Sequence, residues 1–227
     1  MAGSHNAPPE TLKRDLEVGP EDFKERDFYQ LMTALVIPRP IGWISTISAK
    51  GVRNVSPYSY FNLMGTNPFY VAFGSTGEKD NVTNLRQVPE FVVNIVSMDL
   101  IEQMNFSSAD FPPEEDEFAW ADLTPAPAAK VRPPRVAEAR AHLECKVMQI
   151  VDDGDVHIVL ARIVHAHVSK SVWKNGRIDA RLLDPACRLS GSAYAPLGEI
   201  VNVARPAWKD IKGSKGTEKM PRIVRRK

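Results

Sequence analysis

Hydroxyl, amide and aromatic side chains gather between residues 41 and 94, where short apolar runs alternate with polar loops. Within the segment NVSPYSYFN, Pro57 cannot donate a sheet hydrogen bond, so neighbouring backbone groups need other partners. Hydroxyls in a strand can simply face solvent, but this density favours a site for a planar heterocycle with an apolar side. The candidate contacts are Ser45, Thr46, Ser56, Pro57, Tyr58, Ser59, Tyr60, Phe61 and Asn62.

The loop that begins at Ser75 combines hydroxyls, a glycine and a lysine just before an expected helix at 80–87. Backbone N–H groups at a helix N-terminus bind anions, so Ser75, Lys79, Asp80 and Asn81 form a candidate phosphate seat. The alternative is an ordinary capped turn with a solvated lysine. Arg39, between two prolines, is a second candidate cation for the same phosphate.

Several motifs together resemble the flavin reductase-like family with an FMN-binding split barrel, in its flavoredoxin-type branch. They are RPIGWIST, NVSPYSYFN, the KDN segment with Asn84 after it, EFVVNIV, MNFSSADFPPEEDEF, PPRVAEARAHLECKV and RLSGSAYA, and they cover roughly residues 25–198. The resemblance implies that residues 45–46, 56–62 and 79–80 line an FMN site, which Tyr194 approaches. Asn81 departs from the family pattern, which commonly has Thr or Ser there.

The resemblance implies an NAD(P)H-dependent FMN reductase that can serve a separate monooxygenase, with the flavin site completed in a homodimer. Hydride transfer from nicotinamide to flavin requires no protein acid or base, so we expect no catalytic residue of that kind. The acidic loop at 109–122 is expected to narrow access to the flavin. Two alternatives remain open: an FMN electron carrier like flavoredoxin, and a non-enzymatic flavin- or haem-binding module.

The histidines raise the question of a metal site. His157, His165 and His167 share parity along one expected strand, but only the last two are close enough to share an ion. The sequence offers them no evident third ligand, so we expect structural or surface histidines and no metal.

Hydrophobic periodicity and turn residues predict the elements that position these side chains. We expect helices within 22–35, at 80–87 with Asp80 as its cap and Leu85 facing inward, and at 100–106. Expected strands are 43–48, an edge strand interrupted by Pro57, 69–73, 91–96, 141–151 and 155–169, the last two joined by a hairpin turn at Gly154. Many closely spaced strands predict a mainly β protein, an antiparallel split β-barrel with a few short helices.

Composition bounds the remaining possibilities. The chain has 227 residues, a net charge of +1 and 43% hydrophobic residues, and it lacks a Rossmann or P-loop fingerprint. Two cysteines without metal-site spacing and no long apolar run predict a cytoplasmic protein with reduced thiols and no membrane partner. We expect a flexible arm at 1–20, one domain at 21–204 and a basic tail at 205–227. That tail has nine basic and two acidic residues; we expect it to be solvated and expect no nucleic-acid partner.

Overall fold

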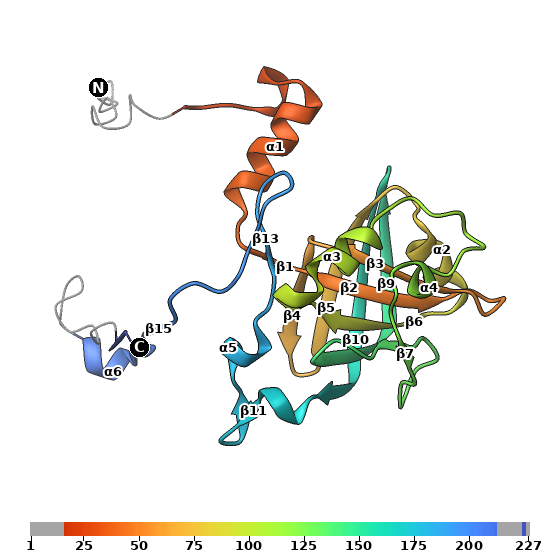
Figure 1. Cartoon of the computed structure of the whole chain (residues 1–227). Coiled ribbons are helices and arrows are strands. Elements are labelled where there is room, and N and C mark those ends of the chain that lie inside the picture. Colours follow the sequence, from red (N-terminus) through yellow and green to blue (C-terminus); the bar gives the residue numbers. More distant parts are fainter. Residues whose placement is uncertain (1–15, 213–223, 226–227) are drawn as a thin grey trace.

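The computed structural model describes residues 16–212 and 224–225 (Figure 1). Its centre is a seven-stranded antiparallel sheet in the order β3-β2-β6-β9-β10-β5-β4. These strands are β2 (Gly42–Ile47), β3 (Arg53–Tyr58), β4 (Phe61–Thr66), β5 (Phe69–Thr76), β6 (Glu90–Ile95), β9 (Ala141–Asp153) and β10 (Val156–Val168).

The two edge strands of this sheet, β3 and β4, are consecutive in the chain and joined by only Ser59 and Tyr60. A sheet whose opposite edges are linked by so short a turn must curl until the edges meet. Consistently, β3 also contacts β5, the strand next to the opposite edge of the sheet. The sheet is therefore a barrel that is open along β3, and the predicted split-barrel class is confirmed.

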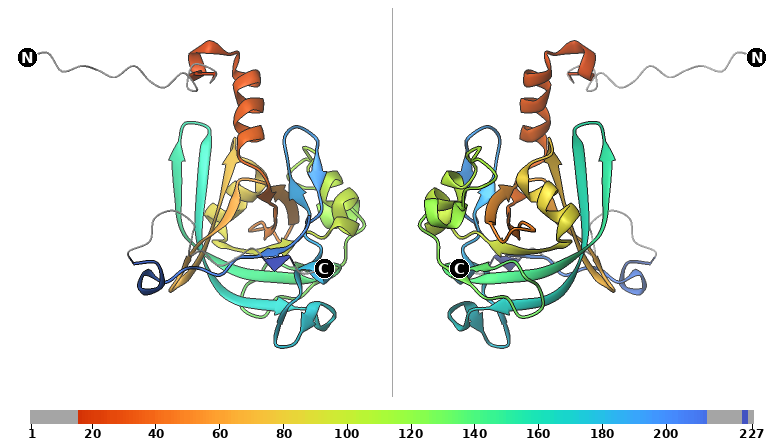
Figure 2. Two further views of the ribbon diagram at one scale, coloured as in Figure 1. Left: turned by 90° about the vertical axis from the view of Figure 1, so that its left-hand side faces the viewer. Right: turned by 90° about the vertical axis from the view of Figure 1, so that its right-hand side faces the viewer.

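Short elements surround the barrel. The helices are α1 (Glu25–Leu35), α2 (Asp80–Gln87), α3 (Ile101–Phe106), α4 (Glu117–Trp120), α5 (Ala180–Leu183) and α6 (Trp208–Ile211), with 3₁₀ turns η2 (Pro20–Asp22), η3 (Met98–Leu100) and η4 (Lys170–Val172). Two-residue strands complete the fold: β1 (Arg39–Pro40), β7 (Pro125–Ala126), β8 (Arg135–Val136), β11 (Trp173–Lys174), β12 (Arg177–Ile178), β13 (Cys187–Arg188), β14 (Tyr194–Ala195), β15 (Val201–Asn202) and β16 (Val224–Arg225). Figure 2 shows α1 projecting away from the barrel.

Alternation along the strands divides the core into two clusters. Ile44 points into the barrel with Phe73 and Phe91, whereas its neighbour Trp43 points outward and packs with Phe118 of α4. The outer cluster lies between the sheet and α3, α4 and the segment 121–139. This second layer brings α4, and with it Glu117, against β3.

Most expected elements are present. The helix α2, the buried Leu85, the hairpin at Gly154 (φ 57°) and the edge position of the Pro57 strand are all confirmed. Two details differ. Lys79, not Asp80, occupies the N-cap of α2, and it makes no side-chain capping bond. The strand β5 is longer than expected because it continues to Thr76, paired with β10.

Within the described residues no helix is long and apolar enough to span a membrane. Residues 1–15 of the predicted arm and residues 213–223 and 226–227 of the predicted tail lie outside the described part of the chain, and the domain boundaries after residues 20 and 204 stay predictions.

Candidate functional site

Three adjoining cavities follow β3 and together form what we call the β3 groove. The acidic cavity, about 200 Å³, lies at the start of α2 and contains Asp80, Asp110 and Glu117. The serine cavity, about 370 Å³, shares Ser56, Tyr58 and Lys79 with it. The apolar cavity, about 440 Å³, shares Ser59, Tyr60 and Gly74 with the serine cavity.

The serine cavity is built by the two turns that flank the open side of the barrel. The 59–60 turn lies on one side, and the segment from Ser75 to the start of α2 lies on the other. Gly77 adopts φ 79°, a backbone conformation that glycine reaches without strain, and its carbonyl accepts a 3.0 Å hydrogen bond from the Ser75 hydroxyl. This turn presents the exposed Lys79 at the N-terminus of α2, where the helix dipole also favours an anion.

The acidic cavity contains buried polar atoms without partners. Asn54 of β3 donates to Glu117 Oε1, while Asn54 Oδ1, Tyr58 Oη and Glu117 Oε2 are buried and make no hydrogen bond with the described residues. Burial, with a further contribution from the negative charge of Asp80, raises the pKa of Glu117 to about 7. Burial also raises the pKa of Tyr58 to about 12. Unsatisfied polar atoms at the wall of a cavity are groups that a ligand or water can pair.

The apolar cavity lies at the other end of the groove. Pro38, Pro40, Tyr60, Phe61 and Met64 line it, together with aliphatic residues of β10. The ring of Phe61 rests directly on Gly42 of β2: a Cβ placed on that glycine would lie 2.8 Å from two ring atoms. The wall of this cavity therefore depends on a position where only hydrogen fits.

Arg39 is buried and fully engaged at the edge of the apolar cavity. Its guanidinium donates to the carbonyls of Thr33 and Val36 at the end of α1 and to that of Leu189 in the β13–β14 loop. A longer contact of 3.5 Å reaches Ser59 Oγ. These bonds tie α1, the 59–60 turn and the late loop together.

The structure brings most of the predicted site residues to the groove. Those that line it are Arg39, Ser56, Pro57, Tyr58, Ser59, Tyr60, Phe61, Asn62, Ser75, Lys79, Asp80 and Asn81. Ser45, Thr46 and Tyr194 line none of the three cavities, and Asn84 lines a neighbouring one between α2 and the turn at Lys50.

The residues outside the groove have internal partners. Ser45 Oγ donates over 2.6 Å to the Pro134 carbonyl on the outer face of the sheet. Thr46 donates to Asn81 Oδ1 over 2.6 Å and accepts from Asn84 Nδ2 over 3.0 Å, which fastens α2 to β2. The Tyr194 ring packs under the Arg188 guanidinium, 4.5 Å from its centroid.

Sequence reasoning missed Glu117 and did not select Asn54 as a site residue. The only available signal for Glu117 was the acidic loop at 109–122. The structure brings this loop to the groove through Ser108, Ala109, Asp110 and Phe111 as well as Glu117. The Arg53–Asp116 ion pair fastens the loop to β3.

Comparison with known proteins gives a consistent result. The structure of nitrilotriacetate monooxygenase component B from Bacillus cereus is 34% identical and superposes with a TM-score of 0.77, covering 82% of this chain and 97% of that one. The 2-nitrobenzoate 2-nitroreductase NbaA of Pseudomonas fluorescens is 26% identical, with a TM-score of 0.79 and coverage of 85% and 98%. Flavoredoxin of Desulfovibrio vulgaris (TM-score 0.68, 20% identical, coverage 73% and 90%) shares the fold.

A model of the flavin reductase like domain matches residues 32–181, which span both walls of the groove and the whole seven-stranded sheet. The resemblance inferred from the sequence motifs is thereby confirmed. The chain belongs to the flavin reductase-like domain family.

Proposed function

We propose that this protein is an NAD(P)H-dependent FMN reductase that binds FMN along the β3 groove. The observation that carries the proposal is that the lining of the groove changes from polar to apolar along its length. It runs from a lysine with several hydroxyls to a wall of prolines and aromatic rings. FMN has the same asymmetry, with a phosphate at one end and a planar ring system at the other.

Lys79 and Ser56 suit the phosphate end, and Ser75, whose hydroxyl donates to the Gly77 carbonyl, holds the turn beside them. A lysine ammonium and the N-terminus of α2 both favour a dianion, and serine hydroxyls can donate to its oxygens. The acidic cavity does not suit a phosphate, because Asp80, Asp110 and Glu117 would repel it. The phosphate is therefore assigned to the serine cavity, on the far side of Lys79 from those carboxyls.

The apolar cavity suits the ring end. Tyr60 and Phe61 offer aromatic faces, and Pro38 and Pro40 add apolar surface to the same cavity. Arg39 has its guanidinium engaged by three carbonyls, so we assign it a positioning role rather than phosphate neutralisation. When bound, FMN would supply the redox chemistry by accepting hydride from a nicotinamide. The chain's residues bind and orient it, and none is assigned as an acid or base.

The likeness to nitrilotriacetate monooxygenase component B supports a role as the reductase partner of a separate monooxygenase. A homodimer, and a cytoplasmic location compatible with two free cysteines, belong to the same proposal. The alternative is an FMN electron carrier, which would take electrons from a protein instead of from NADH or NADPH.

The first test is the visible spectrum of the purified protein before and after anaerobic NADH or NADPH. We expect bound or added FMN to bleach promptly with one nicotinamide. Bleaching only with dithionite would contradict the reductase and favour the carrier. A protein that neither is yellow nor binds added FMN would overturn the site as well.

Lys79→Ala tests the phosphate assignment. Loss of a charge-assisted contact is expected to weaken FMN binding about tenfold or more, measured by flavin fluorescence titration. Riboflavin, which lacks the phosphate, should bind the variant and the wild type alike. Lys174→Ala, in the exposed β11–β12 hairpin, is the matched control and should leave FMN affinity unchanged. If Lys79→Ala binds FMN as tightly as the wild type, the assignment of the phosphate to the serine cavity is wrong.

A further inference from the structure

Four polar side chains form a square on the outer face of β9 and β10. The strands pair His165 with Glu144 and His167 with His142, so all four project from the same face. Cys145, next to Glu144, projects the other way into the barrel core. Tyr58 of the β3 groove belongs to the same barrel core as Cys145. The four polar side chains therefore lie on the other face of the sheet.

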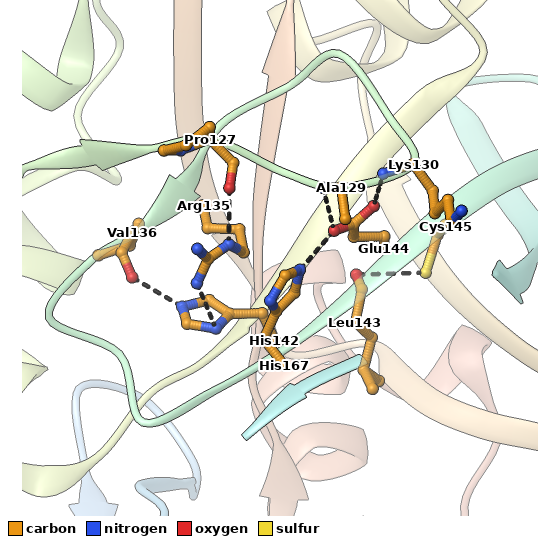
Figure 3. A network of polar contacts seen from close by, with 10 residues as sticks. All are labelled: Pro127, Ala129, Lys130, Arg135, Val136, His142, Leu143, Glu144, Cys145 and His167. Atoms are coloured by element: carbon orange, nitrogen blue, oxygen red, sulfur yellow. Dashed lines mark hydrogen bonds and ion pairs between the residues drawn. The ribbon is translucent and has the colours of Figure 1, made fainter. Parts of the chain in front are cut away.

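Glu144 is completely buried and its carboxylate is firmly placed. Oε1 accepts from the Ala129 N–H over 2.7 Å and Oε2 accepts from the Lys130 N–H over 2.5 Å. Figure 3 shows these bonds from the loop that covers the strands. His167 Nε2 lies 2.5 Å from the same Oε1. A carboxylate oxygen and an imidazole nitrogen are thus already adjacent.

His165 provides a third group without a competing partner. Its ring contacts that of His167, with centroids 4.8 Å apart, and within the described part of the chain it makes no hydrogen bond. One ligand atom from each of Glu144, His165 and His167 lies within 4.8 Å of the others. In a tetrahedral zinc site ligand atoms lie roughly 3.4 Å apart, so modest side-chain rotations would complete the geometry.

His142 is excluded as a ligand because both of its ring nitrogens are engaged. Nε2 lies 2.8 Å from the Val136 carbonyl and Nδ1 lies 3.5 Å from the Arg135 guanidinium (Figure 3). The ring serves as a rigid wall beside His167, 6.1 Å between centroids.

We propose that Glu144, His165 and His167 bind a divalent transition-metal ion such as Zn²⁺. Two imidazoles and one carboxylate form a ligand set that such ions favour, and the half-exposed histidines leave a position open to water. A simple Glu144–His167 hydrogen bond accounts for two members of the group but not for His165. Because Glu144 also holds Ala129 and Lys130, the ion would fasten the 127–136 segment to the barrel.

The sequence did not reveal this site because its third ligand, Glu144, lies on the preceding strand, β9. His165 and His167 alternate along β10, and a β-bulge between Ile163 and His165 brings His165 opposite Glu144. The proposal does not depend on flavin binding, since none of the three ligands lines the β3 groove.

The test is calorimetric titration of the full, metal-free chain with ZnCl₂. We expect one saturable ion per chain and a higher Tm with Zn²⁺ present, because a ligand that binds only the folded state stabilises it. Substituted Co²⁺ should give the visible d–d absorption of a low-coordinate site. His165→Ala should weaken Zn²⁺ binding at least tenfold without changing the Tm of the metal-free protein.

His157→Ala is the control, because His157 lies on the same strand but is hydrogen-bonded to Asp152. It should retain wild-type affinity and stoichiometry. Absence of saturable binding to the wild-type chain would overturn the proposal. Equal affinity in His165→Ala, or an equal loss in His157→Ala, would overturn it too.

Discussion

Glu117 is a carboxyl whose environment opposes its charge. It is 3% exposed, Asp80 lies close enough to add repulsion, and Oε2 has no hydrogen-bond partner in the part of the chain that the structure describes. Asp80 itself has a pKa raised by burial and by the charge of Glu114. The acidic cavity therefore takes up a proton near neutral pH, where most carboxyl groups have lost theirs.

This environment makes stability depend on pH. The folded-state pKa of Glu117, about 7, exceeds the ordinary glutamate value of 4.5, so the folded protein holds the proton over a range where the unfolded chain releases it. The stabilisation is complete below pH 4.5 and lost as pH rises through 7. Because solvent at the cavity screens the charge, we expect about 1–2 kcal/mol from this group.

Glu117→Gln should remove the loss of stability that the wild type shows as pH rises through 7. Denaturant unfolding at pH 5 and pH 8 is expected to show the variant gaining about 1–2 kcal/mol relative to wild type at the higher pH. Glu102→Gln, an exposed position on α3, should follow the wild type at both values. A constant difference between Glu117→Gln and wild type across this range would contradict the raised pKa.

Residue types alone could not decide which polar side chains face a ligand. Thr46 and Lys79 were equal candidates from the sequence, yet Thr46 is buried against α2 and Lys79 lies at the groove. A strand side chain points to one of the two faces of the sheet, and the sequence does not say which face Thr46 takes. The position of α2 decides it, because Asn81 and Asn84 of that helix bind the Thr46 hydroxyl. The sequence did not identify Glu117 as a site residue, because its environment depends on the packing of α4 against β3, which are far apart in the chain.

At the scale of elements, the sequence predicted those helices and strands that are determined by turn residues or by a regular pattern of apolar residues. The Asp152-Asp153-Gly154 turn and the alternating strands beside it predicted the β9–β10 hairpin. The bounds of β5 could not be predicted, because its last residues are held by pairing with β10, a strand far along the chain. The same non-local pairing places Glu144 beside two histidines.

The contact between β2 and the β4 start is the most restrictive junction near the groove. Gly42→Ala would drive a methyl group into Phe61, which is partly buried against the barrel core. We expect a loss of about 1–3 kcal/mol in unfolding free energy, as for other overpacked sites. FMN affinity should fall as well, since Phe61 would be displaced within the apolar cavity.

Gly65→Ala provides the comparison within β4. A Cβ there would meet its nearest atoms, the Pro68 carbonyl oxygen and the Tyr70 ring, at 3.5 and 3.6 Å, which is ordinary contact. Its stability should stay within about 1 kcal/mol of wild type. If both substitutions cost the same, the close approach of Phe61 is not what limits position 42.

At the scale of the whole molecule, α1 buries little of its apolar surface against the described part of the chain. Only Thr33 of this helix is buried, although Phe28, Leu31, Met32 and Leu35 repeat at helical spacing. Leu35 is 68% exposed, and Met64 on β4, which lines the apolar cavity together with Val36, is 57% exposed. Large exposed apolar surfaces of this kind mark interaction sites.

A second copy of the chain is the occupant we expect on this surface, with α1 of each protomer covering the other's apolar cavity. Light scattering should then give about twice the 25.3 kDa of the chain. Leu35→Glu should shift the protein to monomer and weaken FMN binding together, because the same surface closes the ring end of the groove. Ile178→Glu, also exposed but in the β11–β12 hairpin, should leave the mass unchanged. A wild-type monomer that binds FMN tightly would show instead that one chain completes the site.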